Sequence, residues 1–358
     1  MNWVLELARP EIRGLRAYQH AAWEPQLERL HANESPWRVT GDSSAAGLNR
    51  YPEPQPPPLV QGLAALYGVR PEMVLVGRGS DEAIDVLMRI FCRAGRDRVI
   101  VCPPTFGMYA VAARIQGADV VTVPLLAARG FELDIAGILK AVDGNTRLVF
   151  VCSPNNPTGN LVPREQLLDL AARLAPRALL VVDEAYIEFA RTGSLAGALD
   201  DHPNLVVLRT LSKAYALAGA RCGAVLAHPE ITAMLARIIQ PYAIPGPTID
   251  AAMEFTSPTA VAELNKRIGI IREERERLIT ELGKLAIIRR VHPSEGNFLL
   301  LDCTDAEIVL NAAIQVGLII RDQRSQKALP TGVRISIGTP EQNSRLLQGL
   351  QQPKGVAA

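Results

Sequence analysis

Short apolar runs alternate with amphipathic segments between residues 71 and 226. The runs RVIVC (98–102), DVVTV (119–123), RLVFVCS (147–153), ALLVVD (178–183) and NLVVLR (204–209) are almost continuously apolar, as strands covered on both faces are. Between them lie amphipathic segments such as SDEAIDVLMRIFCRAG and REQLLDLAARLAP. This alternation predicts an α/β domain built on a mostly parallel sheet, which we place at residues 33–240.

The pattern changes after about residue 240. The segment QPYAIPGP (240–247) has the proline and glycine content of a loop, and Ser257-Pro258 is typical of the cap and first turn of a long helix. The strand-like runs NFLLLDC, GLIIRD and VRISIG follow, separated by the helical pattern DAEIVLNAAIQV, and a last helix is predicted after Thr339-Pro340. We therefore expect a smaller α+β domain over residues 241–358.

The first part of the chain is less regular. Residues 10–32 predict one amphipathic helix, and residues 33–58 predict an arm or loop that ends in the stiff segment PEPQPPP. We expect residues 1–32 to form an N-terminal arm that packs with the small domain.

Composition narrows the class of protein. Hydrophobic residues make up 48% of the 358 residues, charged residues 21%, and the formal net charge is +1, as in an ordinary globular protein. No basic run predicts a nucleic-acid or membrane partner, and no apolar stretch reaches the roughly 18 residues of a membrane span. The five cysteines are scattered, the five histidines lack metal-ligand spacing, and the first twenty residues lack a secretion signal. We expect a cytoplasmic protein without a metal ion.

The candidate chemistry centres on Lys213 in TLSKAYALAGARCG. Small and apolar neighbours predict a desolvated amine with a lowered pKa, suited to attack on a carbonyl carbon, although a lysine with its amine in solvent is the common alternative. Four further motifs, GRGSDEA, CPPTFGMY, SPNNPTG and VVDEAY, lie at strand ends or strand-to-helix turns. Open α/β sheets form their sites at such positions, so these motifs predict one shared site.

These motifs, in this order and together with LNRYPEPQP, GLIIRD and VRISIGT, resemble the fold-type I pyridoxal-phosphate aminotransferases, and more narrowly the histidinol-phosphate aminotransferases. The likeness runs from about residue 18 to residue 351. It implies a large, mostly parallel-sheet α/β domain with a smaller α+β domain, pyridoxal 5'-phosphate as cofactor, and a homodimer. It also implies amino-group transfer between L-histidinol phosphate and glutamate, with imidazole-acetol phosphate and 2-oxoglutarate as keto partners, in ping-pong order.

The resemblance assigns roles around the cofactor ring. Lys213 would hold pyridoxal phosphate covalently and then move the substrate proton, and Asp183 would keep the ring nitrogen protonated. Asn156 and Tyr186 would donate hydrogen bonds to the 3' oxygen, and Phe106 would stack on the ring where the family often has tyrosine. From the residues alone, Asp183 could equally be a cap after a strand, and SPNNPTG could be a plain turn.

The resemblance also assigns the phosphate site. Its residues would be Ser80, Asp81 and Glu82 at the start of a helix, with Ser212 and Arg221 as further donors. We expect backbone amides to face the phosphate and the carboxylates of Asp81 and Glu82 to turn away from it.

The substrate and partner residues follow from the same likeness. Arg334 would bind a carboxylate, and Arg321, Tyr18 and Asn33 would bind the other end of the substrate. Tyr51 would reach the cofactor phosphate of the neighbouring subunit, which makes the homodimer part of the active site.

Four alternatives stay open on the sequence. Decarboxylases of phospho-amino acids and aromatic amino-acid aminotransferases share the same scaffold. A nucleotide-binding oxidoreductase is suggested by VGRGSDE, which lacks the third glycine of GxGxxG. A non-catalytic cofactor-binding module would need a further binding surface, for which the sequence offers no charge run or appended segment.

Overall fold

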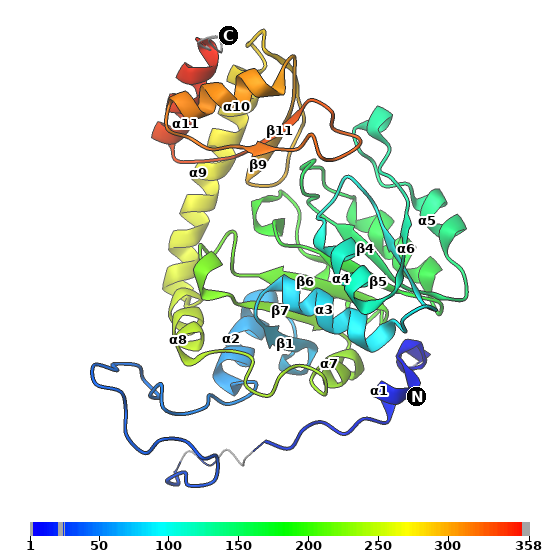
Figure 1. Cartoon of the computed structure of the whole chain (residues 1–358), viewed down its shortest axis with the longest axis vertical. Coiled ribbons are helices and arrows are strands. Elements are labelled where there is room, and N and C mark those ends of the chain that lie inside the picture. Colours follow the sequence, from blue (N-terminus) through cyan, green and yellow to red (C-terminus); the bar gives the residue numbers. More distant parts are fainter. Residues whose placement is uncertain (1–2, 21–23, 25, 353–358) are drawn as a thin grey trace.

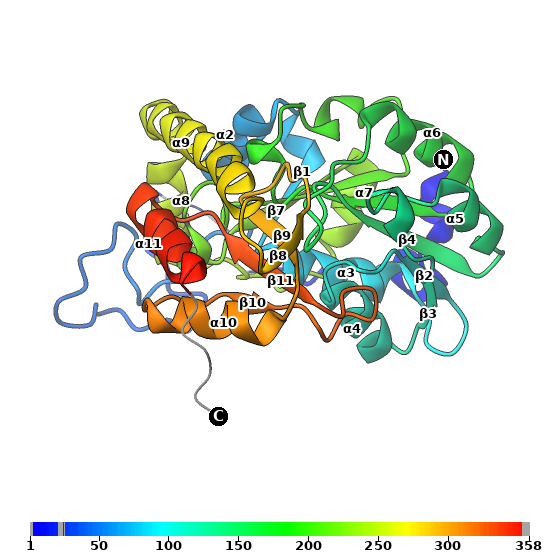
Figure 2. The ribbon, with the colours of Figure 1, turned by 90° about the horizontal axis from the view of Figure 1, so that it is seen from above.

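The structure, a computed structural model, describes residues 3–20, 24 and 26–352. Figure 1 shows a large α/β domain and a smaller domain, with the long helix α9 (Pro258–Leu282) running between them. In Figure 1 the small domain lies at the top of the molecule, at the end of α9 that is remote from α8, and Figure 2 shows the same molecule from above. Within the described residues no helix is long and apolar enough to span a membrane.

The large domain is built on one sheet with the strand order β1-β7-β6-β5-β4-β2-β3. Its central pairs are parallel, whereas β7 runs antiparallel to both β1 and β6. The five strands predicted from apolar runs are confirmed. The strands are β1 (Val74–Gly77), β2 (Arg98–Val101), β3 (Asp119–Thr122), β4 (Thr146–Cys152), β5 (Leu179–Asp183), β6 (Leu205–Thr210) and β7 (Gly223–Ala227).

Helices cover both faces of this sheet, which explains the continuous apolar runs. Along β4, Leu148 and Phe150 pack into one core with α3, α4 and α7, while Val149 and Val151 pack into the other. Successive strand residues point to opposite faces, so a strand between two helical layers needs apolar residues at every position. The helices are α2 (Pro57–Tyr67), α3 (Ser80–Phe91), α4 (Met108–Gln116), α5 (Ile135–Ala141), α6 (Arg164–Leu174), α7 (Pro229–Leu235) and α8 (Gly246–Phe255).

The small domain has a separate core around an antiparallel sheet of order β10-β11-β9-β8. Its predicted helix starts are confirmed: the Ser257 hydroxyl accepts from the Ala260 amide, and Thr339 forms a capping box with Gln342. The run GLIIRD forms a strand only at its last two residues. The elements are β8 (Ile288–Val291), β9 (Phe298–Cys303), α10 (Ala306–Gln315), β10 (Arg321–Asp322), β11 (Gly332–Ser336) and α11 (Pro340–Gln351).

The boundary between the domains lies later than residue 240. Helix α8 packs against α2, and Ala252 of α8 belongs to the large-domain core, so residues 246–255 are part of the large domain. The small domain is tied back by Arg272 of α9, whose guanidinium donates to the carbonyls of Glu188, Phe189 and Ala190.

The N-terminal region departs from the predicted helix over residues 10–32. Of the residues described in this range, only Pro10–Arg13 (α1) are helical, and Leu15 and Tyr18 are 43% and 70% exposed. A short helix without a surface to pack on is marginal in water, which accounts for the difference. The start of the chain lies on the large domain rather than the small one, because Val4 is buried beside α3 and α7 and the Arg9 amide donates to the Ile90 carbonyl at 2.9 Å.

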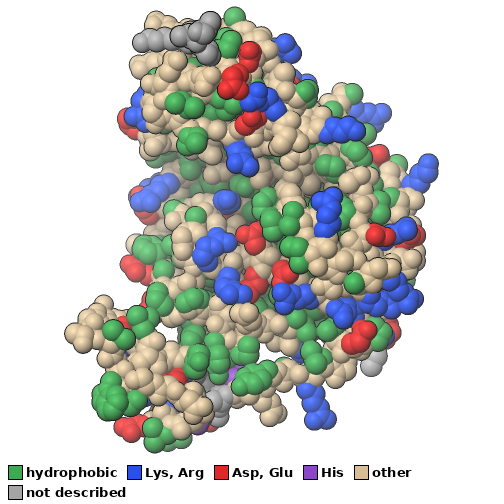
Figure 3. All heavy atoms as spheres, in the orientation of Figure 1, with side chains coloured by type: hydrophobic (Ala, Val, Ile, Leu, Met, Phe, Trp, Pro, Cys, Tyr) green, Lys and Arg blue, Asp and Glu red, His purple; other side chains and the backbone are tan. Residues whose placement is uncertain are grey.

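The described residues between α1 and α2 form an arm that extends away from the body of the molecule (Figure 1). Exposed apolar side chains gather on it, at the lower left of Figure 3, and include Leu27, Leu30, Trp37, Val39 and Leu48. Elsewhere on the face shown, basic and acidic side chains are interspersed.

Candidate active site

One cavity gathers most of the predicted site residues at the carboxyl ends of β4, β5 and β6. Strand ends of a parallel sheet meet at one edge, which is why motifs far apart in the chain converge there. Of the predicted cofactor residues, only Glu82 and Tyr51 are absent from the lining. The cavity is lined by Ser80, Asp81, Phe106, Cys152, Asn156, Asp183, Ala185, Tyr186, Thr210, Ser212, Lys213, Ala218 and Arg221.

Asp183 is the buried carboxylate of the cavity. It ends β5 and is only 3% exposed. Burial raises the pKa of its carboxyl group, whereas hydrogen bonds from the Tyr109 hydroxyl at 2.7 Å and from the Ala185 amide at 3.1 Å act in the opposite direction. The role of Tyr109 was not foreseen from the sequence, although it belongs to the motif CPPTFGMY.

Lys213 follows β6 and lines the cavity. Its neighbours Leu211 and Ala214 are buried, as expected, but Lys213 itself is exposed because its side chain lies in the open cavity. Partial desolvation and the nearby charge of Arg334 nevertheless lower the pKa of its amine. The amine lies 5.7 Å from the centre of the Tyr186 ring. The lowered pKa favours the neutral, nucleophilic amine.

A candidate anion site lies at the start of α3. Gly79 precedes this helix with φ +88°, a conformation that side chains rarely adopt, and a Cβ there would lie 3.1 Å from Arg221 Nη2. Arg221 Nη1 lies 3.3 Å from the Ser212 hydroxyl, and Nη2 lies 3.4 Å from Asp81 Oδ2. Helix amides, a hydroxyl and a guanidinium therefore converge in a setting suited to a phosphate.

The two carboxylates at this helix start behave differently. Glu82 accepts from the Arg78 amide at 2.7 Å and pairs with its guanidinium, so it turns away from the cavity as expected. The Asp81 side chain instead lines the cavity beside Arg221, which differs from the expectation that both carboxylates turn away. The contact with Arg221 explains this placement, because it pairs two half-exposed charges.

Two arginines of the small domain lie side by side at the edge of the site. Arg321 of β10 pairs in register with Arg334 of β11. Arg334 Nη1 donates to Asn156 Oδ1 at 2.5 Å, which connects the small domain to the lining of the cavity. Burial, together with the charge of Arg321, lowers the pKa of Arg334. The pair presents two adjacent positive charges to an anionic ligand.

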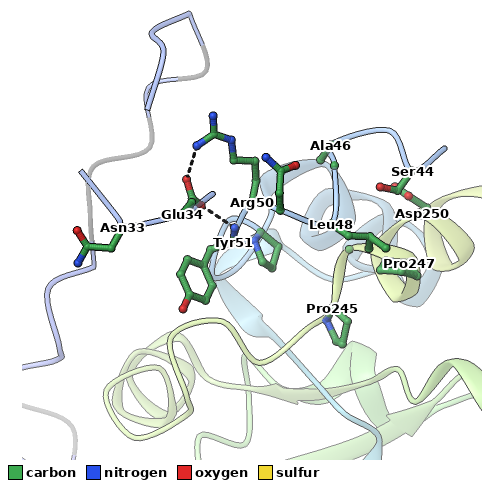
Figure 4. Close-up of a pocket in the computed structure, with 14 residues that line it drawn as sticks. Asn33, Glu34, Ser44, Ala46, Leu48, Arg50, Tyr51, Pro245, Pro247 and Asp250 are labelled. Carbon is green, nitrogen blue, oxygen red and sulfur yellow. Dashed lines mark hydrogen bonds and ion pairs between the residues drawn. The ribbon is translucent and has the colours of Figure 1, made fainter. Parts of the chain in front are cut away.

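Tyr18, Asn33 and Tyr51 do not reach this cavity in their own chain. Tyr51 stacks on Tyr242, with ring centres 4.5 Å apart. Figure 4 shows Tyr51 and Asn33 among the residues that line a hollow between the arm and the start of α8. In this hollow Glu34 accepts from the Tyr51 amide and pairs with Arg50. Tyr18 lines a different hollow, together with residues around Arg237.

A buried charge cluster under the site is a second feature that sequence reasoning missed. Arg209 of β6 lies between Glu184 and Glu188, and its guanidinium carbon is 4.4 Å from the centre of the Tyr67 ring. Glu184 directly follows Asp183 and also accepts from the Leu195 amide at 2.7 Å. The cluster therefore fixes the backbone that carries Asp183.

Comparison with known proteins agrees with this geometry. The sequence model of the family "Aminotransferase class I and II" matches residues 24–350, and the chain belongs to this family. It is 48% identical to the histidinol-phosphate aminotransferase of Xylella fastidiosa, over 99% of this chain and 98% of that protein.

Two solved structures extend the comparison. The histidinol-phosphate aminotransferase of Sinorhizobium meliloti, in complex with pyridoxal-5'-phosphate, has a TM-score of 0.74 and 28% identity, covering 84% of this chain and 82% of that one. The L-threonine-O-3-phosphate decarboxylase of Porphyromonas gingivalis has a TM-score of 0.72 and 26% identity, covering 85% and 90%. The scaffold is thus shared with a decarboxylase, as the sequence alternatives anticipated.

The cofactor of this family is pyridoxal 5'-phosphate, and the cavity fits its three chemical features. Asp183 supplies a buried carboxylate for the ring nitrogen, Lys213 an amine for the aldehyde, and the start of α3 with Arg221 supplies donors for the phosphate. Among the described residues, no group of three or more histidine, cysteine or acidic side chains could hold a metal ion.

Proposed function

We propose that this aminotransferase interconverts L-histidinol phosphate and 2-oxoglutarate with imidazole-acetol phosphate and L-glutamate, in ping-pong order, as a cytoplasmic homodimer. The observation that carries the proposal is the pairing of Arg321 with Arg334 beside Asn156, at the edge of the Lys213 cavity. Glutamate carries two carboxylates and histidinol phosphate carries a phosphate, so both substrates present an anion to the same arginine pair.

The roles of the ring-side residues follow from their positions. Asp183 would hold the proton on the ring nitrogen, and Asn156 and Tyr186 would donate to the 3' oxygen. The amide oxygen of Asn156 accepts a hydrogen bond from Arg334, so the Asn156 amino group can donate into the cavity. Phe106 would cover the face of the ring. The phosphate would be held by the amides of Ser80 and Asp81 together with Ser212 and Arg221.

Lys213 would move the reacting proton. When bound, the cofactor supplies an electron sink for the negative charge that develops at the substrate Cα. With the cofactor bound, the Lys213 amine would take the proton from that carbon as a general base and would later return a proton as a general acid. Its lowered pKa makes the neutral form available for the first of these steps.

The arm supports the homodimer and the partner's contribution to the site. Tyr51 is 49% exposed, and Trp37 and Leu30 are 79% and 91% exposed on the same arm. Apolar side chains gathered on a projecting arm favour contact with a second copy of this chain. In that dimer, Tyr51 would reach the cofactor phosphate of the neighbouring subunit, and Tyr18 and Asn33 would contact the substrate.

The test is a half-reaction without a keto acid. The purified enzyme, loaded with pyridoxal phosphate, is mixed with L-histidinol phosphate while the visible absorption band of the lysine-bound cofactor is followed. We expect the band to disappear with one equivalent of imidazole-acetol phosphate per site. Lys213→Ala should lack the band, whereas Lys266→Ala, which removes an exposed lysine of α9, should behave as wild type.

Two results would contradict the proposal. Release of carbon dioxide from a phospho-amino acid, without any keto product from histidinol phosphate, would identify a decarboxylase. Full turnover with aromatic amino acids and none with histidinol phosphate would identify an aromatic amino-acid aminotransferase.

A further inference from the structure

Tyr109 is a buried tyrosine that no step of the proposed reaction uses. It lies in the first turn of α4, is 0% exposed, and its hydroxyl donates to Asp183 Oδ2 at 2.7 Å. Its ring stacks on Phe150, with centres 4.9 Å apart and planes at 18°, and meets the edge of Phe106 at 5.6 Å and 81°. Two aromatic contacts therefore hold the ring in one orientation, which fixes the direction of the hydroxyl.

Among the described residues, Tyr109 is the only side chain that donates a hydrogen bond to Asp183, and no lysine or arginine forms an ion pair with it. The second oxygen of Asp183 accepts only from the Ala185 amide. Other groups near this carboxyl are the acid Asp81, the amine of Lys213, and the neutral thiol and phenol of the cavity wall. A buried carboxylate with so few partners depends strongly on each donor.

We propose that Tyr109 is a positioning residue, which keeps Asp183 ionised and oriented so that its free lone pairs point into the cavity toward the ring nitrogen of the cofactor. The inference rests on the cofactor site of the proposed function and adds a residue to it. A phenol forms a stronger hydrogen bond to an ionised carboxylate than to a neutral carboxyl group, so this hydrogen bond favours the ionised acid over the neutral one.

The titration of both groups fits this role. Burial and the adjacent charge of Asp183 raise the pKa of the Tyr109 phenol, so it stays a donor at neutral pH. Burial raises the pKa of Asp183, and the hydrogen bond from Tyr109 opposes that rise. Removing the Tyr109 hydroxyl should therefore raise the pKa of Asp183 further, so the carboxylate takes up a proton at a higher pH.

The experiment measures cofactor affinity as a function of pH. Equilibrium dialysis gives the Kd for pyridoxal phosphate between pH 5.5 and 8.5 for the wild type and for Tyr109→Phe, which keeps the stacked ring. We expect the acid limb, where affinity is lost, to move to higher pH by about one unit in the variant. The ratio of Kd values should be largest, about 10-fold, on the acid side of the wild-type limb, and it should shrink toward one at higher pH, where Asp183 is ionised in both proteins. The free cofactor also gains or loses protons over this pH range, but it does so equally in both measurements, so this effect cancels in the ratio of the two Kd values.

Tyr67→Phe is the matched control. It also removes a buried phenol hydroxyl, one that has no hydrogen-bond partner among the described residues, and it keeps the ring that contacts Arg209. Its acid limb should coincide with that of the wild type. If the ratio of the Tyr109→Phe Kd to the wild-type Kd is the same at every pH, the inference is overturned. General damage to the site would lower the affinity at every pH without moving the acid limb.

A double-mutant cycle and a second variant complete the test. In an Asp183→Asn background, Tyr109→Phe should change the Kd less than 2-fold, and full additivity of the two substitutions would refute the coupling. If Tyr109→Phe does not fold, 3-fluorotyrosine at position 109 strengthens the donor, and the acid limb should then move to lower pH. These readouts concern cofactor binding only, so they stay informative even if histidinol phosphate is not the substrate.

Discussion

Replacing Arg209 by methionine should lower the free energy of unfolding by about 3–5 kcal/mol, because it leaves two buried carboxylates without their cation. Arg209 Nη2 lies 2.6 Å from Glu188 Oε1, and Nη1 lies 3.6 Å from Glu184 Oε2. The three side chains are 7%, 11% and 2% exposed, so water does not replace the lost partner. Methionine has a similar length, so the loss comes from the uncompensated charges rather than from a cavity.

The loss should depend on pH. Burial already raises the pKa of Glu184, and Arg209 opposes that rise. Without Arg209 the folded state holds a proton that the unfolded state releases above about pH 4.3. The variant's free energy of unfolding should therefore fall as the pH rises from about 4.3 toward the raised pKa. Because Arg209 keeps the pKa of Glu184 lower in the wild type, the difference between the two proteins should grow with pH.

Urea unfolding followed by circular dichroism, with saturating cofactor in every sample, measures this difference. Arg173→Met removes a half-exposed pair with Asp169 on α6 and should change stability by no more than about 0.5 kcal/mol. Adding Glu184→Gln and Glu188→Gln to Arg209→Met should restore part of the loss. A loss below about 1 kcal/mol that does not vary with pH would show that the cluster is not held by charge.

Three further predictions follow from single contacts. Asp97→Asn should lower stability by about 3 kcal/mol at pH 7 in urea unfolding, because two arginines bond this fully buried carboxylate and, against the effect of burial, lower its pKa. That difference should shrink below about pH 4, as the carboxylate becomes protonated. Gly79→Ala should raise the Kd for pyridoxal phosphate about 10-fold in equilibrium dialysis, because φ is +88° and the new Cβ would crowd Arg221. Arg334→Lys should lower kcat/KM for glutamate at least 10-fold in steady-state assays, because lysine cannot bind both Asn156 and a carboxylate in a fixed fork.

The sequence predicts the elements that depend on local patterns. Continuous apolar runs identify strands buried on both faces, and the caps at Ser257 and Thr339 mark helix starts within a residue. Residues 10–32 show the limit of this reasoning, because an amphipathic pattern is helical only where the apolar face meets another surface. Past Arg13 the large apolar side chains of this segment that the structure describes, Leu15, Tyr18, Leu27 and Leu30, are mostly exposed in the single chain.

The site was predictable where a motif carries both the residue and its position. Lys213, Asp183 and Asn156 belong to such motifs, and the structure brings them into one cavity. The partners of these residues were not predictable, since Tyr109 and Asp183 are separated by 74 positions and meet only through the packing of α4 on the sheet. Arg209 sits within an apolar strand run, where nothing in the pattern indicates the two acids it pairs with.

The charges around the cavity explain how a nearly neutral chain attracts anionic ligands. The net charge of +1 provides almost no long-range attraction, so any attraction must come from local charge. Three positive charges lie around the cavity, those of Lys213, Arg221 and Arg334. Among the described residues, the negative charges that act on Lys213 are those of Asp81 and Asp183. Burial and then the charge of Arg334 lower the pKa of Lys213, and the charge of Arg334 also favours a phosphate or carboxylate at the edge of the site. Arg334 therefore contributes both to anion binding and to activation of the amine, and a bound anion near Arg334 should raise the pKa of Lys213 again.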